Sequence, residues 1–237
     1  MNMQSTMVKN LLDLFIGILL LSLKKWQKMF EIKHKLFPNS GWLEIKLSKE
    51  ILNHLNKAIK KKKQNYNHKL VGHIEGSYIL EDKDNWFFKT VLLKCITEYI
   101  SKFGGHVVPI TFTRDCPYVL NSLWVNYQKK HQFNPVHHHT GAFSFVIWIK
   151  IPTSHKKESK VSFVKHANLK SASSFTFLYS NILGHLQYFE YKLEPQDEGT
   201  MLFFPSRLNH AGYPFYTSNK NRISISGNIA FNTSKIK

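Results

Sequence analysis

The feature that most constrains the fold is a series of short β-rich segments that fills the chain from His106 onward. Branched and aromatic residues dominate each segment, and turns rich in Pro, Gly, Asn or Lys separate many of them. The predicted strands are residues 107–112, 122–127, 143–151, 160–164, 174–179, 186–193, 200–204 and 223–231. This pattern predicts an α+β but mainly β chain, an antiparallel jelly roll of the cupin-like, double-stranded β-helix kind.

Two amphipathic helices are expected before these strands. Ser48 can cap the first, in which apolar residues recur at helical spacing up to Ile59, after a short strand at 42–47. The second covers residues 84–103 and has a wide apolar face, with Gly104 as its stop. We therefore expect a helical support region at residues 29–105 and a β core at 106–237.

Residues 1–28 form a separate N-terminal extension with one apolar run, residues 11–23, that contains Asp13. About 13 residues are fewer than the roughly 20 that span a bilayer, and no small-residue cleavage site follows. Three interpretations stay open: a packing helix, a membrane anchor, or a start of translation at Met29. A charged Asp13 within the run disfavours a membrane anchor, so we rank membrane contact through residues 11–23 below the other two interpretations.

Composition excludes some classes of function. With 43% hydrophobic residues the chain can bury a large core, and two separated cysteines, Cys95 and Cys116, argue against a disulfide scaffold or a thiolate zinc site. Cysteine usage is compatible with a reducing compartment, so we expect a cytoplasmic protein. The net charge of +18 would suit nucleic acid, but only three of 33 basic residues are Arg, and this strong Lys bias does not favour that partner.

A first histidine motif lies between two predicted strands, in the segment FNPVHHHTGAFS at residues 133–144. If His139 begins the second strand, His137 and His139 point to the same side, because strand side chains alternate with period two. His138 then points away. Two imidazoles on one face are typical ligands of a first-row metal.

A second motif, GTMLFFPSRLNH, ends at His210. Twelve residues later comes Arg222, and Ser224 follows it on the same face of a predicted strand. A guanidinium and a hydroxyl placed in this way can bind a carboxylate. Each residue alone also fits an ordinary structural role, but the order His-x-His, His, Arg-x-Ser predicts a metal site beside an anion site.

These motifs resemble the Fe(II)/2-oxoglutarate-dependent dioxygenase superfamily, in particular a branch of 2OG-Fe(II) oxygenases from phages and bacteria. The resemblance covers roughly residues 70–232. It implies that His137, His139 and His210 bind Fe(II), and that Arg222 with Ser224 holds the distal carboxylate of 2-oxoglutarate. Asn126 or Tyr127 would add hydrogen bonds to the co-substrate, although ordinary strand packing explains those two residues slightly better.

The resemblance also implies O2 as co-substrate, ascorbate as reductant, and decarboxylation of 2-oxoglutarate to succinate during hydroxylation. If a phage encodes the chain, it would act in the host cytoplasm. The sequence does not distinguish among a peptidyl prolyl group, a nucleobase and a small metabolite as the substrate. It does not indicate an oligomeric state either.

One departure from the superfamily keeps two alternatives open. The superfamily's iron site has a carboxylate where this chain has His139. A zinc-binding, cupin-like protein is therefore one alternative, because three His ligands and an open position also suit Zn(II). The other is a non-catalytic jelly-roll binding protein with a basic surface.

Overall fold

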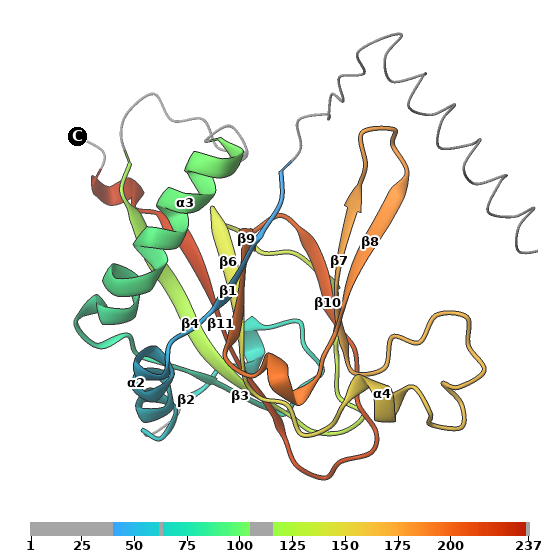
Figure 1. The fold of residues 1–237 in the computed structure, drawn as a ribbon. Coiled ribbons are helices and arrows are strands. Elements are labelled where there is room, and N and C mark those ends of the chain that lie inside the picture. The colour runs from blue at the N-terminus through green and yellow to red at the C-terminus, as the bar shows by residue number, and fades with distance from the viewer. Residues whose placement is uncertain (1–39, 62–63, 105–115, 236–237) are drawn as a thin grey trace, which may run out of the picture. The chain divides into compact units, whose positions relative to one another are not determined.

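The computed structural model describes residues 40–61, 64–104 and 116–235 (Figure 1). The predictions for residues 1–28 and for a strand at 107–112 lie outside these ranges. Among the described residues, no helix is long and apolar enough to cross a membrane.

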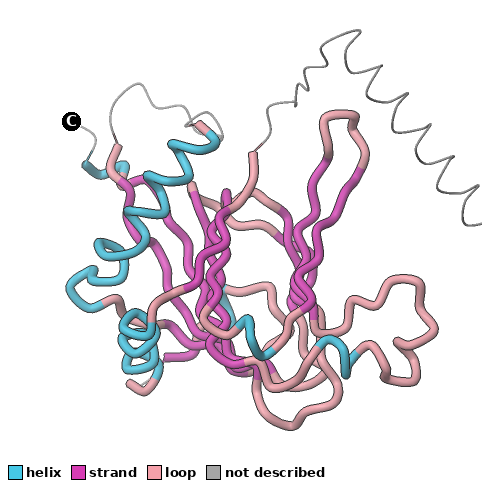
Figure 2. The backbone as a smooth tube through the Cα atoms, viewed as in Figure 1, coloured by secondary structure: helices cyan, strands magenta, loops and turns pink. Residues whose placement is uncertain are grey.

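Two antiparallel sheets form the core of the protein (Figures 1 and 2), which confirms the predicted mainly β jelly roll. The larger sheet has the strand order β1 (Leu43–Lys46), β9 (Thr200–Pro205), β6 (Phe143–Lys150), β11 (Arg222–Phe231), β4 (Tyr118–Gln128), β3 (Gly76–Ile79) and β2 (Gln64–Asn65). The smaller sheet has the order β5 (Asn134–His137), β10 (Asn209–Gly212), β7 (Ser174–Ser180) and β8 (Leu186–Lys192).

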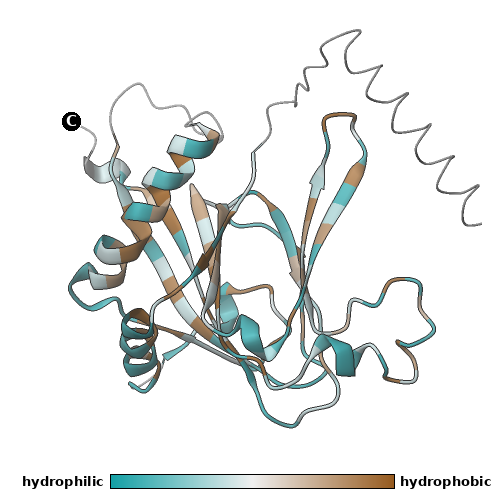
Figure 3. Cartoon of the chain, in the orientation of Figure 1, coloured by the Kyte–Doolittle hydropathy of each residue, from teal (hydrophilic) through white to brown (hydrophobic). Residues whose placement is uncertain are grey.

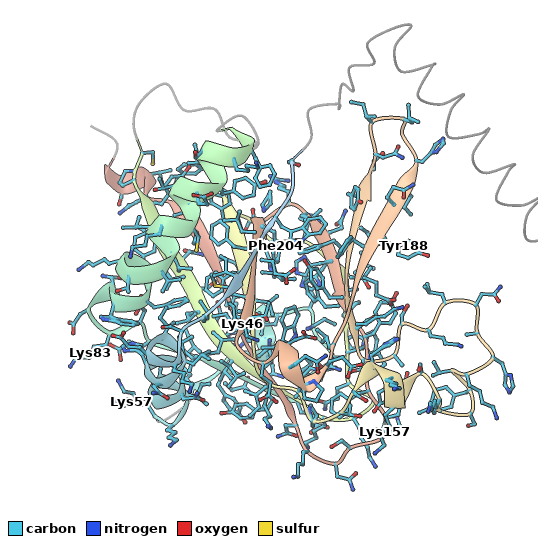
Figure 4. All side chains as sticks on the ribbon, viewed as in Figure 1. Lys46, Lys57, Lys83, Lys157, Tyr188 and Phe204 are labelled. Atoms are coloured by element: carbon cyan, nitrogen blue, oxygen red, sulfur yellow. The ribbon has the colours of Figure 1, made fainter. Side chains whose placement is uncertain are left out.

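Alternation along β9 divides its side chains between two apolar clusters. Met201 and Phe203 join the cluster shared with the helices, whereas Leu202 and Phe204 join the cluster between the sheets. There the ring of Phe204 lies 4.9 Å from that of Phe177 on β7, centroid to centroid (Figure 4). All four β9 side chains are at most 1% exposed, so both faces of the strand are buried.

The helices cover the outer face of the larger sheet, where apolar positions of α2 and α3 meet it (Figure 3). Helix α2 (Lys49–Ile59) begins as predicted, with the Ser48 hydroxyl oxygen accepting a hydrogen bond from the Ile51 N–H. The predicted helix at 84–103 is regular only over α3 (Leu93–Phe103), and Gly104 ends it in the left-handed region.

The start of the second predicted helix differs from expectation because Asp84 and Asn85 have positive φ angles of 58° and 53°. The Asp82 carboxylate accepts hydrogen bonds from the next two free N–H groups, those of Phe87 and Phe88. A π-helical turn at Phe88–Leu92 then leads into α3. Helical periodicity in the sequence does not distinguish such a turn from an α-helix.

Most predicted strands within the described residues are present, but the one at 160–164 is wrong. These residues form turns after the short helix α4 (His155–Glu158), with hydrogen bonds from the Val161 N–H to the Glu158 carbonyl and from the Val164 N–H to the Val161 carbonyl. Because local hydrogen bonds of this kind use the backbone groups, those groups cannot pair with a neighbouring strand. Four short strands were not predicted: β2, β3, β5 and β10. The last two carry His137 and His210.

Candidate metal centre

Three histidines from two distant parts of the chain converge between the sheets. His137 ends β5 and pairs in register with His210 on β10, and His139 lies in the connection from β5 to β6. One ring nitrogen of each lies within 4.8 Å of the others. Such a spacing allows one ion to contact all three rings.

The position of His139 differs from the sequence prediction, because β6 begins only at Phe143. The backbone N–H of His139 donates to the Ser206 carbonyl at 2.8 Å, and the Ser206 hydroxyl donates to the Gly141 carbonyl at 2.5 Å. Gly141 has a φ of 110°, and a Cβ there would lie 2.7 Å from a backbone carbonyl oxygen of β11. This glycine lets the connection pass close to β11 and turn His139 toward the other two rings.

Backbone carbonyls fix the orientation of two of the rings. The Nδ1 of His137 lies 2.7 Å from the Pro135 carbonyl oxygen, and the Nδ1 of His210 lies 2.8 Å from that of Leu208. A neutral ring that donates from Nδ1 keeps the lone pair of Nε2 for a metal. Both rings therefore have the tautomer that a metal ligand requires.

Burial keeps the three imidazoles neutral. It lowers the pKa of His137, lowers that of His139 to about 4, and lowers that of His210 well below its ordinary value. The neighbouring histidines add to each shift, since two protonated rings would repel one another. At neutral pH the cluster thus offers lone pairs rather than protons.

The histidines line a cavity of about 380 Å³ between the two sheets. No Asp or Glu is among the described residues that line it. Its wall combines amide and hydroxyl side chains with aromatic rings, including Asn126, Gln128, Trp148, Phe175 and Ser224. The basic residues that line the cavity are Arg222 and Lys69, and Lys69 is exposed. Away from the histidine cluster, the cavity therefore favours anionic over cationic groups.

Arg222 is 3% exposed and reaches the cavity from the first position of β11. Its Nη1 donates to the Gln128 side-chain oxygen and the Tyr213 carbonyl, its Nη2 donates to the Ser173 hydroxyl, and its guanidinium carbon lies 5.0 Å from the centre of the Phe215 ring. Its Nε is buried and has no hydrogen-bond partner among the described residues. Burial lowers the pKa of Arg222 to about 10, so the group remains a cation at neutral pH.

Asn126 and Tyr127, the two residues predicted to assist Arg222, lie on opposite faces of β4, because successive side chains of a strand alternate. Asn126 pairs in register with Ser224, lines the cavity and accepts a hydrogen bond from the Ser77 hydroxyl at 2.8 Å. Tyr127 packs on the opposite face against the helix-side core, with its ring 6.0 Å from that of Tyr78. Tyr127 is not among the cavity-lining residues, so of these two residues Asn126 is the one that faces the cavity.

Sequence reasoning missed the residues that hold Arg222. Gln128 could have been found, because it shares the face of Asn126 and lies opposite Arg222 in the β4–β11 register. Ser173 has a positive φ of 57° and belongs to no recognisable motif. The segment at residues 153–174 lies between the two histidine motifs in sequence, but only its last residue, Ser174, is among the lining residues.

A buried carboxylate fixes the segment that precedes Arg222. Glu158 is 0% exposed and accepts hydrogen bonds from the hydroxyls of Thr153 and Thr217 and from the N–H groups of Tyr216 and Thr217. Burial alone would raise the pKa of Glu158, but these hydrogen bonds outweigh it and hold the pKa below the ordinary value of 4.5. The carboxylate thereby ties α4 to the chain that supplies the Arg222 contacts.

Replacing Glu158 by Gln is expected to lower the free energy of unfolding by about 3 kcal/mol, because charge-assisted hydrogen bonds are lost and an amide NH2 faces other donors. Urea denaturation of the full chain measures the change. Glu75→Gln is the matched control: Glu75 pairs with Lys129 on the surface, where both side chains are more than half exposed, and its loss should cost less than about 1 kcal/mol. Equal effects of the two substitutions would contradict this role for Glu158.

The same carboxylate predicts a pH dependence of stability. Because the pKa of Glu158 is lower in the folded than in the unfolded chain, its contribution is complete above about 4.5 and is lost as pH falls through the folded value. The difference in unfolding free energy between wild type and Glu158→Gln should therefore shrink as pH is lowered from 6 to 3. A difference that stays constant over this range would show that the carboxylate charge is not what stabilises the fold.

The geometry defines a class of protein. It is a jelly roll in which one cavity contains a neutral three-histidine cluster and a buried guanidinium that has no carboxylate in an ion pair with it among the described residues. Residues 122–228, which include all of these groups, match the family model described as "Putative 2OG-Fe(II) oxygenase". The match covers less than half of the chain, and it is to the family that the motifs of this part of the chain resemble. A comparison with curated protein sequences gives no match.

Several solved structures are similar over most of the chain. A prolyl-4-hydroxylase from Pseudomonas putida has 12% identity and a TM-score of 0.44, covering 80% of this chain and 91% of that one. An oxidoreductase of the 2OG-Fe(II) oxygenase family from Burkholderia pseudomallei has 11% identity and a TM-score of 0.46, covering 80% and 85%. A prolyl hydroxylase from Trichoplax adhaerens has 16% identity and a TM-score of 0.43, covering 83% and 86%. These values are too low to assign a substrate.

Proposed function

We propose that this protein is an Fe(II)- and 2-oxoglutarate-dependent oxygenase in which His137, His139 and His210 bind the metal. The observation that carries the proposal is the pairing, in one cavity, of a neutral imidazole cluster with the buried cation of Arg222. A metal site alone would not need that cation. A dicarboxylate that contacts both groups explains why they share the cavity.

The histidine cluster fits a divalent first-row metal. Its rings are neutral, two of them present Nε2, and their nitrogens lie close enough to share one ion. Three neutral ligands leave the full 2+ charge of the metal, so an anionic co-substrate would offset charge that a protein carboxylate offsets elsewhere in the superfamily. The variant triad is therefore compatible with binding of 2-oxoglutarate.

Arg222 fits the distal carboxylate of that co-substrate. A guanidinium has five N–H donors, and the contacts to protein groups use three, which leaves Nε–H and one Nη2–H. Nε and Nη2 form one edge of the guanidinium, and such an edge matches the two oxygens of a carboxylate. Ser224, two residues away on the cavity face, can add a hydroxyl donor.

When bound, Fe(II) and 2-oxoglutarate would supply the oxidising chemistry, in which O2 is consumed and decarboxylation to succinate and CO2 is coupled to hydroxylation of a substrate C–H bond. The protein would orient the reactants. The Pro135 and Leu208 carbonyls hold two of the rings, and Arg222 sets the position of the co-substrate's far end. The rings of Trp148 and Phe175 help to exclude water from the cavity.

For the substrate, we infer a neutral or anionic group, since a cation would meet no carboxylate among the described lining residues. A peptidyl prolyl group, a nucleobase and a neutral or anionic metabolite all satisfy this condition. The exposed Lys69 at the mouth would attract an anionic substrate.

The test of this function needs no substrate. With Fe(II), ascorbate and O2, the purified protein should slowly convert 2-oxoglutarate to succinate without any other substrate present. The same protein loaded with Zn(II) should not. Tight binding of Zn(II) together with no succinate from the Fe(II) form, and no stabilisation by 2-oxoglutarate, would instead support the zinc-binding alternative.

A further inference from the structure

A second charged region lies away from the cavity, on the segment that follows β6. Residues 155–170, here called the α4 loop, comprise helix α4 and the turns after it, and they project from the lower edge of the smaller sheet (Figure 1). The α4 loop contains five exposed lysines: Lys156, Lys157, Lys160, Lys165 and Lys170. Its place is marked by Lys157 in Figure 4, on the opposite side of the view from Lys57 and Lys83.

The lysine ammonium groups of the α4 loop form no ion pair within the described part of the chain, although the Glu194 carboxylate accepts a hydrogen bond from the Lys156 backbone N–H at 3.1 Å. The ion pairs found there are Lys129 with Glu75 and Lys150 with Glu198, and neither involves the loop. The loop's one acid, Glu158, is buried and bound by Thr153, Thr217 and nearby N–H groups. Five ammonium groups within 16 residues of sequence therefore face solvent without an exposed acid of the loop between them.

An aromatic side chain lies among these lysines. Phe163 is 65% exposed, and burying so much apolar surface against a partner would be favourable. The ring of Tyr216 contacts it edge to face at 4.8 Å and is itself 5.4 Å from the ring of His131. The backbone N–H of Tyr216 donates a hydrogen bond to the buried Glu158 carboxylate, which holds in place the ring that Phe163 contacts.

We propose that the α4 loop is a binding surface for single-stranded nucleic acid. The lysines before and after Phe163 would contact backbone phosphates, and the exposed ring would stack on a base. Single strands expose their bases, whereas a duplex does not offer them to a surface ring. This proposal is independent of the oxygenase proposal, because none of residues 155–170 lines the cavity.

Other polyanions fit the α4 loop less well. Insertion into a lipid surface needs several neighbouring apolar side chains, and Phe163 and Leu169 are the only large exposed ones in the loop. An acidic protein segment would use the lysines but has no requirement for an aromatic platform. The combination of dispersed lysines with one supported ring is what favours a single-stranded polynucleotide.

The test measures binding of the full chain to a fluorescein-labelled 20-nucleotide oligo(dT) by fluorescence anisotropy at several salt concentrations. Replacing Lys156, Lys160 and Lys165 by Gln should reduce the slope of log affinity against log salt by about 2, from roughly 0.7 per phosphate contact. Phe163→Ala should weaken binding about tenfold, within the range for loss of one stacked base. Unchanged melting temperatures would confirm that both variants fold.

The matched control replaces Lys57, Lys83 and Lys102, exposed lysines on or near the helices, by Gln. It removes the same charge, and it should leave affinity and salt slope within about twofold of wild type, because those side chains make no phosphate contact in this proposal. Equal loss in both triple variants would overturn the proposal in favour of a general field effect. Binding that is unaffected by Phe163→Ala, or stronger binding to phosphatidylserine vesicles than to oligo(dT), would also overturn it.

Discussion

The His210→Ala protein is expected to form at least about 100-fold less succinate than wild type, since loss of a partner that merely orients a ligand already costs up to that much. His210 is 5% exposed and pairs in register with His137, so no neighbouring side chain can take its place. The measurement is succinate formed from 2-oxoglutarate with Fe(II), ascorbate and O2, together with the iron retained after desalting. Iron content should fall in parallel with activity.

His138→Ala is the control for that experiment. His138 lies between two of the proposed ligands in sequence but is exposed and does not belong to the three-histidine cluster. This variant should keep its iron and most of its succinate formation. Loss of activity in His138→Ala to the same degree, or full activity in His210→Ala, would mean that the ligand set is wrong.

Substitution of Arg222 by Lys is expected to remove most of the affinity for 2-oxoglutarate while the iron is retained. Lys keeps the charge but cannot present two parallel donors to a carboxylate, and loss of one partner from a buried charged contact costs about 2–5 kcal/mol, or roughly 30-fold to several thousand-fold in Kd. Stability shows the effect without turnover. A concentration of 2-oxoglutarate 100 times its Kd should raise the unfolding free energy of wild type by about 2.7 kcal/mol, and the same concentration should hardly change that of Arg222→Lys.

Ser224→Ala provides the comparison within the same site. It removes one hydroxyl from the cavity face and leaves the guanidinium with all its supports, so a loss of about 1 kcal/mol, near fivefold in Kd, is expected. If Arg222→Lys bound 2-oxoglutarate as well as Ser224→Ala does, the anion site would have to lie elsewhere in the cavity. Iron retention in both variants separates this outcome from a failure of the metal site.

Much of this architecture could be predicted because its signals are local. Runs of branched and aromatic residues identify β4, β6, β9 and β11, and capping chemistry places the start of α2 at Ser48. The alternation of side chains along a strand puts Arg222 and Ser224 on one face, which is the face that lines the cavity. These inferences need only the chemistry of neighbouring residues.

What could not be predicted depends on contacts between distant segments. The pairing of His137 with His210 is a register between strands about 70 residues apart, and both strands are too short and polar to give a periodic signal. His139 reaches the cluster from a loop shaped by Ser206 and Gly141, rather than from a strand. Two supports of Arg222, the Tyr213 carbonyl and the Ser173 hydroxyl, likewise come from separate segments, which no spacing in the sequence brings together.

The two-sided burial of β9 sets a limit on how this sequence can change. Deletion of one residue between Gly199 and Pro205 would exchange the side chains of the two clusters, moving Leu202 and Phe204 to the helix side. It would also turn the start of β10 and draw His210 away from its partners. The fixed distance from glycine to histidine in the second motif is therefore a requirement of packing, and insertions in homologues of this chain should fall in the surface turns around β9 and not within it.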